Sequence, residues 1–123
     1  MTMTTYTITR SGLRDLTFAG EILASASDRR VAGKEKTRWQ EITLYALERG
    51  GYLLQNEYLT LWQGEFGSSS ATVCETARDV LDKLEHIGGG LSDLAKELLQ
   101  EAARKDASFE NIWVERLEDE EVC

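Results

Sequence analysis

Alternating apolar and polar residues run through the first part of the chain and predict an antiparallel sheet. The segment 4–9 is rich in β-branched residues, which pack well on a pleated surface. A second strand is predicted over 16–26, with a bend at Gly20, because glycine inside a strand often marks one. A loop of small residues over 64–70 then precedes a short strand over 71–74.

The segments 39–48 and 52–62 predict a long hairpin, because the glycines between them supply the positive φ angles of a tight turn. A two-residue loop at Gly50 and Gly51 pairs Arg49 with Tyr52. This register places the large aromatic residues beside polar residues on one face of the sheet. That face carries Trp39, Glu41, Thr43, Tyr45, Asn56, Tyr58, Thr60 and Trp62. The opposite face carries Ile42 and Leu59.

Helical spacing replaces alternation in the second half of the chain. Thr76 followed by Asp79 predicts a helix start with partial capping-box character, and the three glycines at 88–90 predict where this helix ends. Ser92 is the predicted cap of a second helix. The apolar residues from Leu94 to Ala102 recur at helical spacing and predict its buried side.

These elements predict an α+β fold, in which an antiparallel sheet of about five strands has two helices packed on one face. The segment 111–117 resembles a last strand that returns to the sheet. A length of 123 residues with 41% hydrophobic residues is enough for one core of ordinary size. We therefore expect a single domain over 1–117, followed by an acidic, flexible tail over 118–123.

Charge is unevenly divided along the chain, whose net charge is -8. Residues 1–50 hold eight Lys and Arg against six Asp and Glu, or +2, whereas residues 51–123 hold six against sixteen, or -10. This asymmetry disfavours direct binding of nucleic acid by the second half, because phosphate contacts need cations. An anionic face instead suits a basic protein partner, such as a nucleic-acid-binding protein. The alternative is that the acids only keep a small domain soluble.

No apolar run approaches the roughly 20 residues that a membrane-spanning helix needs. The first residues also lack the basic and apolar regions of a secretion signal. We therefore expect a cytoplasmic protein without a membrane contact. The two cysteines, Cys74 and Cys123, are expected to be free thiols, because their number and spacing fit neither a disulfide framework nor a zinc site.

Residues suited to catalysis are sparse. His86 is the only histidine, and its place just before the glycines favours contact with carbonyls at a helix end over proton transfer. Cys74 has no nearby cysteine or histidine, and a cysteine in a strand usually serves as a small apolar filler. The chain lacks calcium-loop spacing and a pair of histidines. We therefore expect no enzymatic activity, no metal and no cofactor.

The segment 28–38 concentrates basic side chains in what the sequence predicts to be an exposed connection. Five cations stand there against two acids, Asp28 and Glu35. A phosphate-bearing ligand or the acidic half of a second copy can dock on such a segment, and a solvated loop is the alternative. The five candidate residues are Arg29, Arg30, Lys34, Lys36 and Arg38.

The aromatic face of the predicted hairpin is a second candidate site. Large aromatic side chains dominate protein contacts, and neighbouring polar groups orient the partner. The same rings can equally form the core beneath the two helices. The candidate partner-binding residues are Trp39, Glu41, Tyr45, Tyr58 and Trp62.

Three stretches of the chain, 20–24, 38–45 and 51–54, form a pattern in which a strand ending in tyrosine turns through glycine into an aromatic strand. This pattern resembles the strand-rich segment of the EXLDI family of small bacterial proteins. The ending over 113–120 is loosely similar to the acidic terminus for which that family is named. The resemblance implies a bacterial or mobile-element origin and no particular activity.

Together these features predict a non-enzymatic binding protein that acts on a macromolecular partner. Small acidic inhibitors, immunity proteins and phage-encoded anti-defence factors are proteins of this type. The alternative is a homodimeric module that encloses a small ligand, using the basic segment 28–38 and the aromatic face.

Overall fold

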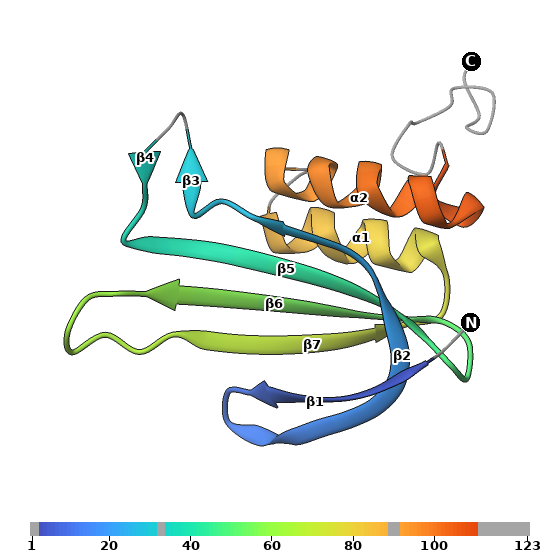
Figure 1. The fold of residues 1–123 in the computed structure, drawn as a ribbon, viewed down its shortest axis with the longest axis horizontal. Helices are drawn as coiled ribbons and strands as arrows, with labels where there is room; N and C mark the ends of the chain where they lie inside the picture. The colour runs from blue at the N-terminus through green and yellow to red at the C-terminus, as the bar shows by residue number, and fades with distance from the viewer. Residues whose placement is uncertain (1–2, 32–33, 89–91, 111–123) are drawn as a thin grey trace.

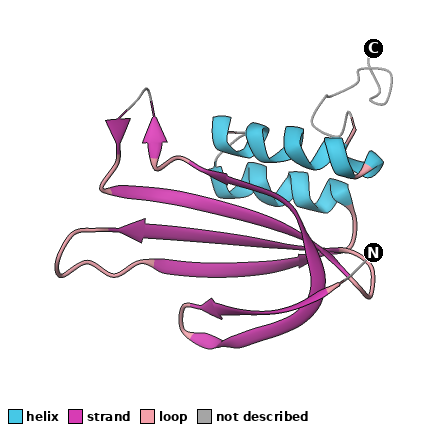
Figure 2. Cartoon of the chain, viewed as in Figure 1, coloured by secondary structure: helices cyan, strands magenta, loops and turns pink. Residues whose placement is uncertain are grey.

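The computed structural model describes residues 3–31, 34–88 and 92–110. Its main feature is a five-stranded antiparallel sheet, curled on itself, with two helices beside it (Figure 1; Figure 2). The strand order is β1-β2-β5-β6-β7. The strands are β1 (Thr4–Arg10), β2 (Leu13–Ser27), β5 (Arg38–Leu47), β6 (Tyr52–Thr60) and β7 (Ser68–Cys74). The predicted α+β class with an antiparallel sheet is confirmed.

A small hairpin and the helices complete the described part of the chain. The hairpin consists of β3 (Arg30–Val31) and β4 (Lys34–Glu35) and lies within the segment predicted to be an exposed basic connection. The helices are α1 (Ala77–Gly88), α2 (Asp93–Lys105) and the 3₁₀ turn η1 (Ala107–Phe109). The strand predicted over 111–117 and the tail over 118–123 lie outside the described residues.

Both helices begin where the sequence predicts. At the start of α1, the Asp79 backbone N–H donates to Thr76 Oγ1 at 3.2 Å, and the Thr76 N–H donates to Asp79 Oδ2 at 3.3 Å. This reciprocal pair is a capping box. At the start of α2, Ser92 Oγ accepts from the Ala95 N–H at 3.1 Å. The helix α1 extends through Gly88, and the two glycines after it lie outside the described residues.

The predicted register of the β5–β6 hairpin is wrong by three residues. The last strand pair is Ala46 with Tyr52, and beyond it the Leu47 N–H donates to the Gly51 carbonyl at 3.0 Å, so the loop contains Glu48, Arg49 and Gly50. The Gly50 N–H donates to the Leu47 carbonyl at 3.0 Å, and Gly50 takes a positive φ of +99°. A turn followed by a left-handed glycine is the usual three-residue hairpin loop. The two glycines therefore do not form the turn by themselves.

This shift separates the aromatic residues that the predicted register had placed together. An odd shift moves one strand's side chains to the other face of the sheet. Trp39 pairs with Leu59, and it shares a face with Glu41 and Tyr45, whereas Tyr58 pairs with Gln40 and lies on the opposite face. The predicted common aromatic face does not exist.

The larger core joins buried residues of the sheet to those of both helices. Leu98 and Leu99 of α2 and Phe109 of η1 are completely buried in it. From β2, β5, β6 and β7 it takes Leu23, Ala24, Ala26, Ile42, Leu44, Leu54 and Cys74. The five residues that the sequence predicts for the buried side of α2 are all buried.

A smaller core fills the inside of the curled sheet and contains no helix residue among those described. It consists of Ile8, Tyr45, Leu47 and Leu53, with Tyr6, Leu16, Phe18 and Ala71 packed against them. Ring centroids of Tyr6, Phe18 and Tyr45 lie 4.9 to 5.6 Å apart.

Hydrogen bonds between the two outer strands hold the curl. The Ser11 N–H donates to the Ser69 carbonyl at 2.8 Å, and Ser69 Oγ donates to the Thr9 carbonyl at 2.6 Å. β7 begins at Ser68, within the segment predicted to be a loop, and it continues to pair with β6 there. The serines thus bring the start of β7 against the end of β1.

The smaller core's face also holds two carboxylates directly opposite each other, Glu41 on β5 and Glu57 on β6. Burial raises the pKa of Glu57, and the charge of Glu41 raises it further. The folded chain therefore holds the Glu57 proton more tightly than the unfolded chain. Stability from this group falls as pH rises from the ordinary glutamate pKa through the raised value.

Replacing Glu57 with glutamine should therefore stabilise the protein at pH 7. We expect the free energy of unfolding to rise by about 0.2–1 kcal/mol, the usual size of a cross-strand side-chain interaction. Urea unfolding at pH 7 and below pH 4 measures the effect, which should disappear at the lower pH. The matched control Glu97→Gln, on the exposed side of α2, should change little. An equal gain at both pH values would contradict the explanation.

Candidate functional site

Three of the five candidate partner-binding residues have structural contacts inside the fold. Trp39 and Tyr45 are buried. The Trp39 indole Nε1 donates to Glu41 Oε2 at 2.9 Å, and the Tyr45 hydroxyl donates to Gln55 Oε1 at 3.1 Å. Burial raises the pKa of Tyr45. Trp39 and Tyr45 are therefore interior residues, but neither belongs to the larger core that includes the helices, and Tyr45 lies in the smaller core.

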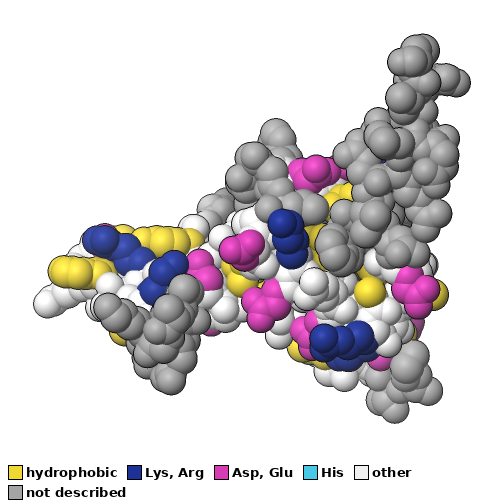
Figure 3. Space-filling view, turned by 90° about the horizontal axis from the view of Figure 1, so that it is seen from above, with side chains coloured by type: hydrophobic (Ala, Val, Ile, Leu, Met, Phe, Trp, Pro, Cys, Tyr) yellow, Lys and Arg dark blue, Asp and Glu magenta, His cyan; other side chains and the backbone are white. Residues whose placement is uncertain are grey.

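The other two, Tyr58 and Trp62, are exposed and lie near the loop that joins β6 to β7. We call residues 61–67 the tip loop. Trp62 is 54% exposed, Leu61 is 61% exposed and Phe66 is 90% exposed. The loop lies at the left end of the sheet in Figure 1, and Figure 3 shows hydrophobic and basic side chains gathered at that end. Large apolar groups are thus concentrated on an exposed connection.

A carboxylate at the centre of the tip loop fixes its conformation. Glu65 accepts two hydrogen bonds from Arg38 Nε, at 2.9 and 3.0 Å, and one from Thr60 Oγ1 at 2.7 Å. Arg38 Nη2 forms an ion pair with the same carboxylate. The hydrogen bonds from Arg38 and, to a smaller extent, from Thr60 lower the pKa of Glu65. The hydrogen bond to Glu65 in turn raises the pKa of Arg38. Glu65 is therefore charged at neutral pH and ties the loop to β5.

Trp62 is held in place from the side of β5 as well. Its indole Nε1 donates to Thr37 Oγ1 at 2.8 Å, and the Arg38 guanidinium lies 5.1 Å from the ring centroid. The Glu65 N–H closes a turn onto the Trp62 carbonyl at 3.2 Å, with Gly64 at a φ of +87°. The carboxylate of Glu65 and the indole N–H of Trp62 are thus hydrogen-bonded within the protein, whereas the apolar side chains of the loop stay exposed.

The basic segment 28–38 is also engaged by the rest of the chain. Arg29 lies 4.4 Å from the Trp39 ring centroid, and Lys36 forms an ion pair with Asp28 at 3.3 Å. Arg38 is the partner of Glu65 in the tip loop. The side chains of Arg30 and Lys34 lie outside the described residues. The three cations whose side chains are described thus have carboxylate or aromatic neighbours, which reduces their availability to a phosphate.

Reactive groups add little to the site. Among residues 3–31, 34–88 and 92–110, no three His, Cys, Asp or Glu side chains come together as metal ligands. Cys74 is a buried free thiol, and burial raises its pKa, which disfavours the reactive thiolate. The side chain of His86 and all of Cys123 lie outside the described residues. In the same described part of the chain, no helix has the length and apolar character to cross a membrane.

The sequence interpretation missed Leu61, Glu65 and Phe66, which are central to the tip loop. A signal was present, because large apolar residues stand there among glycines, where a surface loop is ordinarily polar. The geometry identifies exposed apolar side chains on a loop that hydrogen bonds hold to β5. No protein-family model, no curated protein and no solved structure matches the chain, so the EXLDI resemblance stays a prediction.

Proposed function

We propose that this chain is a non-enzymatic binding protein that anchors on a protein partner through the tip loop. The observation that carries the proposal is the joint exposure of Leu61, Trp62 and Phe66 on a loop held by Arg38 and Glu65. Contiguous exposed apolar groups are typical of interaction sites. An inhibitor, an immunity protein or an anti-defence factor would use such a surface to occupy a site on its target.

The order of the tip loop supports tight binding. A loop that is already fixed loses less conformational entropy when it binds. Burying a Phe side chain contributes about 1.5–3 kcal/mol, and Phe66 gains almost none of this in the free protein. Tryptophan, tyrosine and arginine are the residue types most enriched among binding hot spots. Trp62, Tyr58 and Arg38 supply one of each in the tip loop or at the strand ends next to it.

We also propose that α1 and α2 together cover one face of the sheet and present acidic groups away from it. In support, the residues of β5 and β6 that belong to the larger core are all even-numbered, so they share one face of the sheet. The residues of β5 and β6 in the smaller core lie on the opposite face. Exposed acids follow both helices, including Asp79, Asp82, Glu85, Asp93 and Glu97. A complementary partner would offer an apolar cleft to the tip loop and basic groups to the acidic side of the helices.

Affinity purification from the native host, followed by binding measurements with the purified partner, tests the proposal. Phe66→Ala and Trp62→Ala should each raise the Kd at least about 30-fold, which is the effect of a hot spot of about 2 kcal/mol. Leu13→Ala is the matched control, because Leu13 is an exposed apolar residue on β2, outside the tip loop. It should leave the Kd within about twofold. Thermal unfolding should be unchanged in Phe66→Ala and Leu13→Ala, whereas Trp62→Ala also loses the hydrogen bond to Thr37 Oγ1.

Two outcomes would overturn this function. If the partner binds Phe66→Ala and Trp62→Ala as tightly as it binds the wild type, the tip loop is not the contact surface. If the wild type retains no protein and instead forms a dimer that Phe66→Ala abolishes in sedimentation experiments, the loop joins two copies of this chain. A stoichiometric complex lost in both tip variants and kept in Leu13→Ala would support the proposal.

A further inference from the structure

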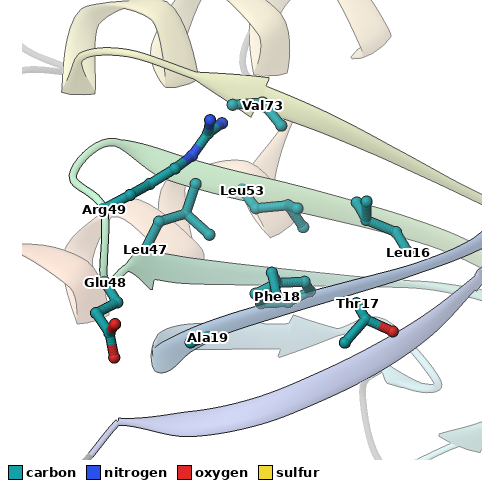
Figure 4. Close-up of a pocket in the computed structure, with 9 residues that line it drawn as sticks. All are labelled: Leu16, Thr17, Phe18, Ala19, Leu47, Glu48, Arg49, Leu53 and Val73. Carbon is teal, nitrogen blue, oxygen red and sulfur yellow. The ribbon is translucent and has the colours of Figure 1, made fainter.

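The inside of the curled sheet contains a pocket at the end of β5 and β6 opposite the tip loop. It has a volume of about 400 Å³ and lies between β2, β7 and the turn that joins β5 to β6. Figure 4 shows its lining side chains. Its apolar wall consists of Leu16, Phe18, Leu47, Leu53 and Val73.

The curl of the sheet explains why apolar groups surround this space. Leu16 and Phe18 of β2 pack against the smaller core, which includes Leu47 and Leu53 across the sheet. Val73 of β7 completes the wall and is about half exposed. Pockets of about 300–1,000 Å³ with mainly apolar linings are typical of small-molecule sites, and they often occur in the mouths of curled or closed sheets.

One charged group gives the pocket a preference for anionic ligands. Arg49 projects from the β5–β6 turn toward Val73, whereas the Glu48 carboxylate points away from that guanidinium (Figure 4). Arg49 is exposed, and none of the ion pairs among the described residues involves it. A guanidinium recognises a carboxylate through two parallel hydrogen bonds. The pocket thus combines an apolar interior with one cation at its rim.

We propose that this pocket binds a small amphiphilic carboxylate, with its apolar body against Leu47, Leu53 and Phe18 and its carboxylate on Arg49. A neutral amphiphile of the same length fills the same space but lacks the contact with Arg49. The site is separate from the tip loop, so ligand binding in the pocket can be tested independently of partner binding at the tip loop.

Titration with decanoate below its micelle concentration, followed by methyl NMR of leucine and valine, tests this site. Saturable shifts are expected at Leu16, Leu47, Leu53 and Val73, and none at Leu98, which is buried in the larger core. Decanol should bind about tenfold more weakly than decanoate, because it lacks the charge-assisted hydrogen bonds. The absence of saturable shifts with decanoate would overturn the proposal.

Two variants separate the roles of shape and charge. Arg49→Gln should weaken the binding of decanoate about tenfold, to the affinity of decanol. The matched control Arg104→Gln, at an exposed position of α2, should leave the preference for decanoate over decanol intact. Val73→Trp places a larger side chain in the wall at a half-exposed position and should abolish binding of both probes. Equal decanoate affinity in Arg49→Gln, or shifts that persist in Val73→Trp, would show that decanoate binds elsewhere.

Discussion

Replacing Phe109 with alanine should lower the free energy of unfolding by about 3–5 kcal/mol, the usual cost of removing a buried phenyl ring. Phe109 is 0% exposed and belongs to the larger core with α2. Its ring meets the Tyr52 ring edge to face, with centroids 5.0 Å apart and an interplanar angle of 77°. The ring thus packs η1 against β6, and its loss leaves a cavity between them. Urea unfolding followed by circular dichroism measures the change.

Hydrogen bonds at Asp106 explain why the residues around Phe109 cannot easily rearrange to fill the space of its ring. The Tyr52 hydroxyl donates to Asp106 Oδ2 at 2.7 Å, and the Ser108 N–H donates to Asp106 Oδ1 at 2.9 Å. Although burial raises the pKa of Asp106, these hydrogen bonds outweigh it and keep the pKa below its ordinary value. The charged carboxylate fixes the start of η1, so the surrounding groups collapse little when the ring is removed.

The matched control for Phe109→Ala is Phe66→Ala, because both changes remove the same ring. Phe66 is 90% exposed in the tip loop, and its replacement should alter stability by less than about 0.5 kcal/mol. The two variants therefore separate a residue that stabilises the fold from one that is proposed to bind a partner. Equal losses of stability would show that Phe109 is not a core residue or that Phe66 is not a surface residue.

Replacing Gly20 with alanine should cost about 2–3 kcal/mol, the upper part of the range for overpacking. A Cβ at this position would lie 2.3 Å from the Ala46 carbonyl oxygen, a backbone atom that cannot rotate away. Gly20 pairs with Thr4 on one side and Leu47 on the other. The added methyl group would therefore push β2 away from β5 at a position where β2 is paired on both sides. Thermal and urea unfolding measure the loss.

The control for Gly20→Ala is Gly12→Ala in the turn between β1 and β2. Gly12 has a φ of +75°, but no atom lies within 4 Å of a Cβ placed there. Its replacement should cost only about 1–2 kcal/mol, the strain of a left-handed conformation. If Gly20→Ala is the milder of the two, close approach of β2 and β5 is not what requires glycine.

Local signals in the sequence predicted the helices and most strands correctly. Thr76, Asp79 and Ser92 act on backbone groups within three residues of themselves, so their effect can be read from neighbouring residues. The pairing of β5 with β6 depended on the loop type. Gly50-Gly51 suits both a two-residue and a three-residue loop, and these differ in which residues share a face. A correct set of strands therefore produced an incorrect aromatic face.

The candidate site was predictable only in part. Trp62 and Tyr58 were named from the sequence, but the contact between Arg38 and Glu65 joins residues 27 positions apart and follows from the pairing of β5 with β6. The pocket depends on the curl of β2 toward β7, which no local pattern encodes. The segment 28–38 looked like a free cluster of cations because its carboxylate and aromatic partners lie partly outside it.

The hydrogen bonds of Ser69 with Thr9 and Ser11 have a consequence for how this chain meets other chains. β1 and β7 are the edge strands of the sheet, and exposed edges are templates for strand addition and fibril growth. Where these two edges meet, the Ser11 N–H donates to the Ser69 carbonyl, and the hydroxyls of Ser11 and Ser69 bond the Ser69 N–H and the Thr9 carbonyl. This contact shields part of the backbone that could otherwise pair with strands of other chains. Recognition of a partner there depends on side chains instead.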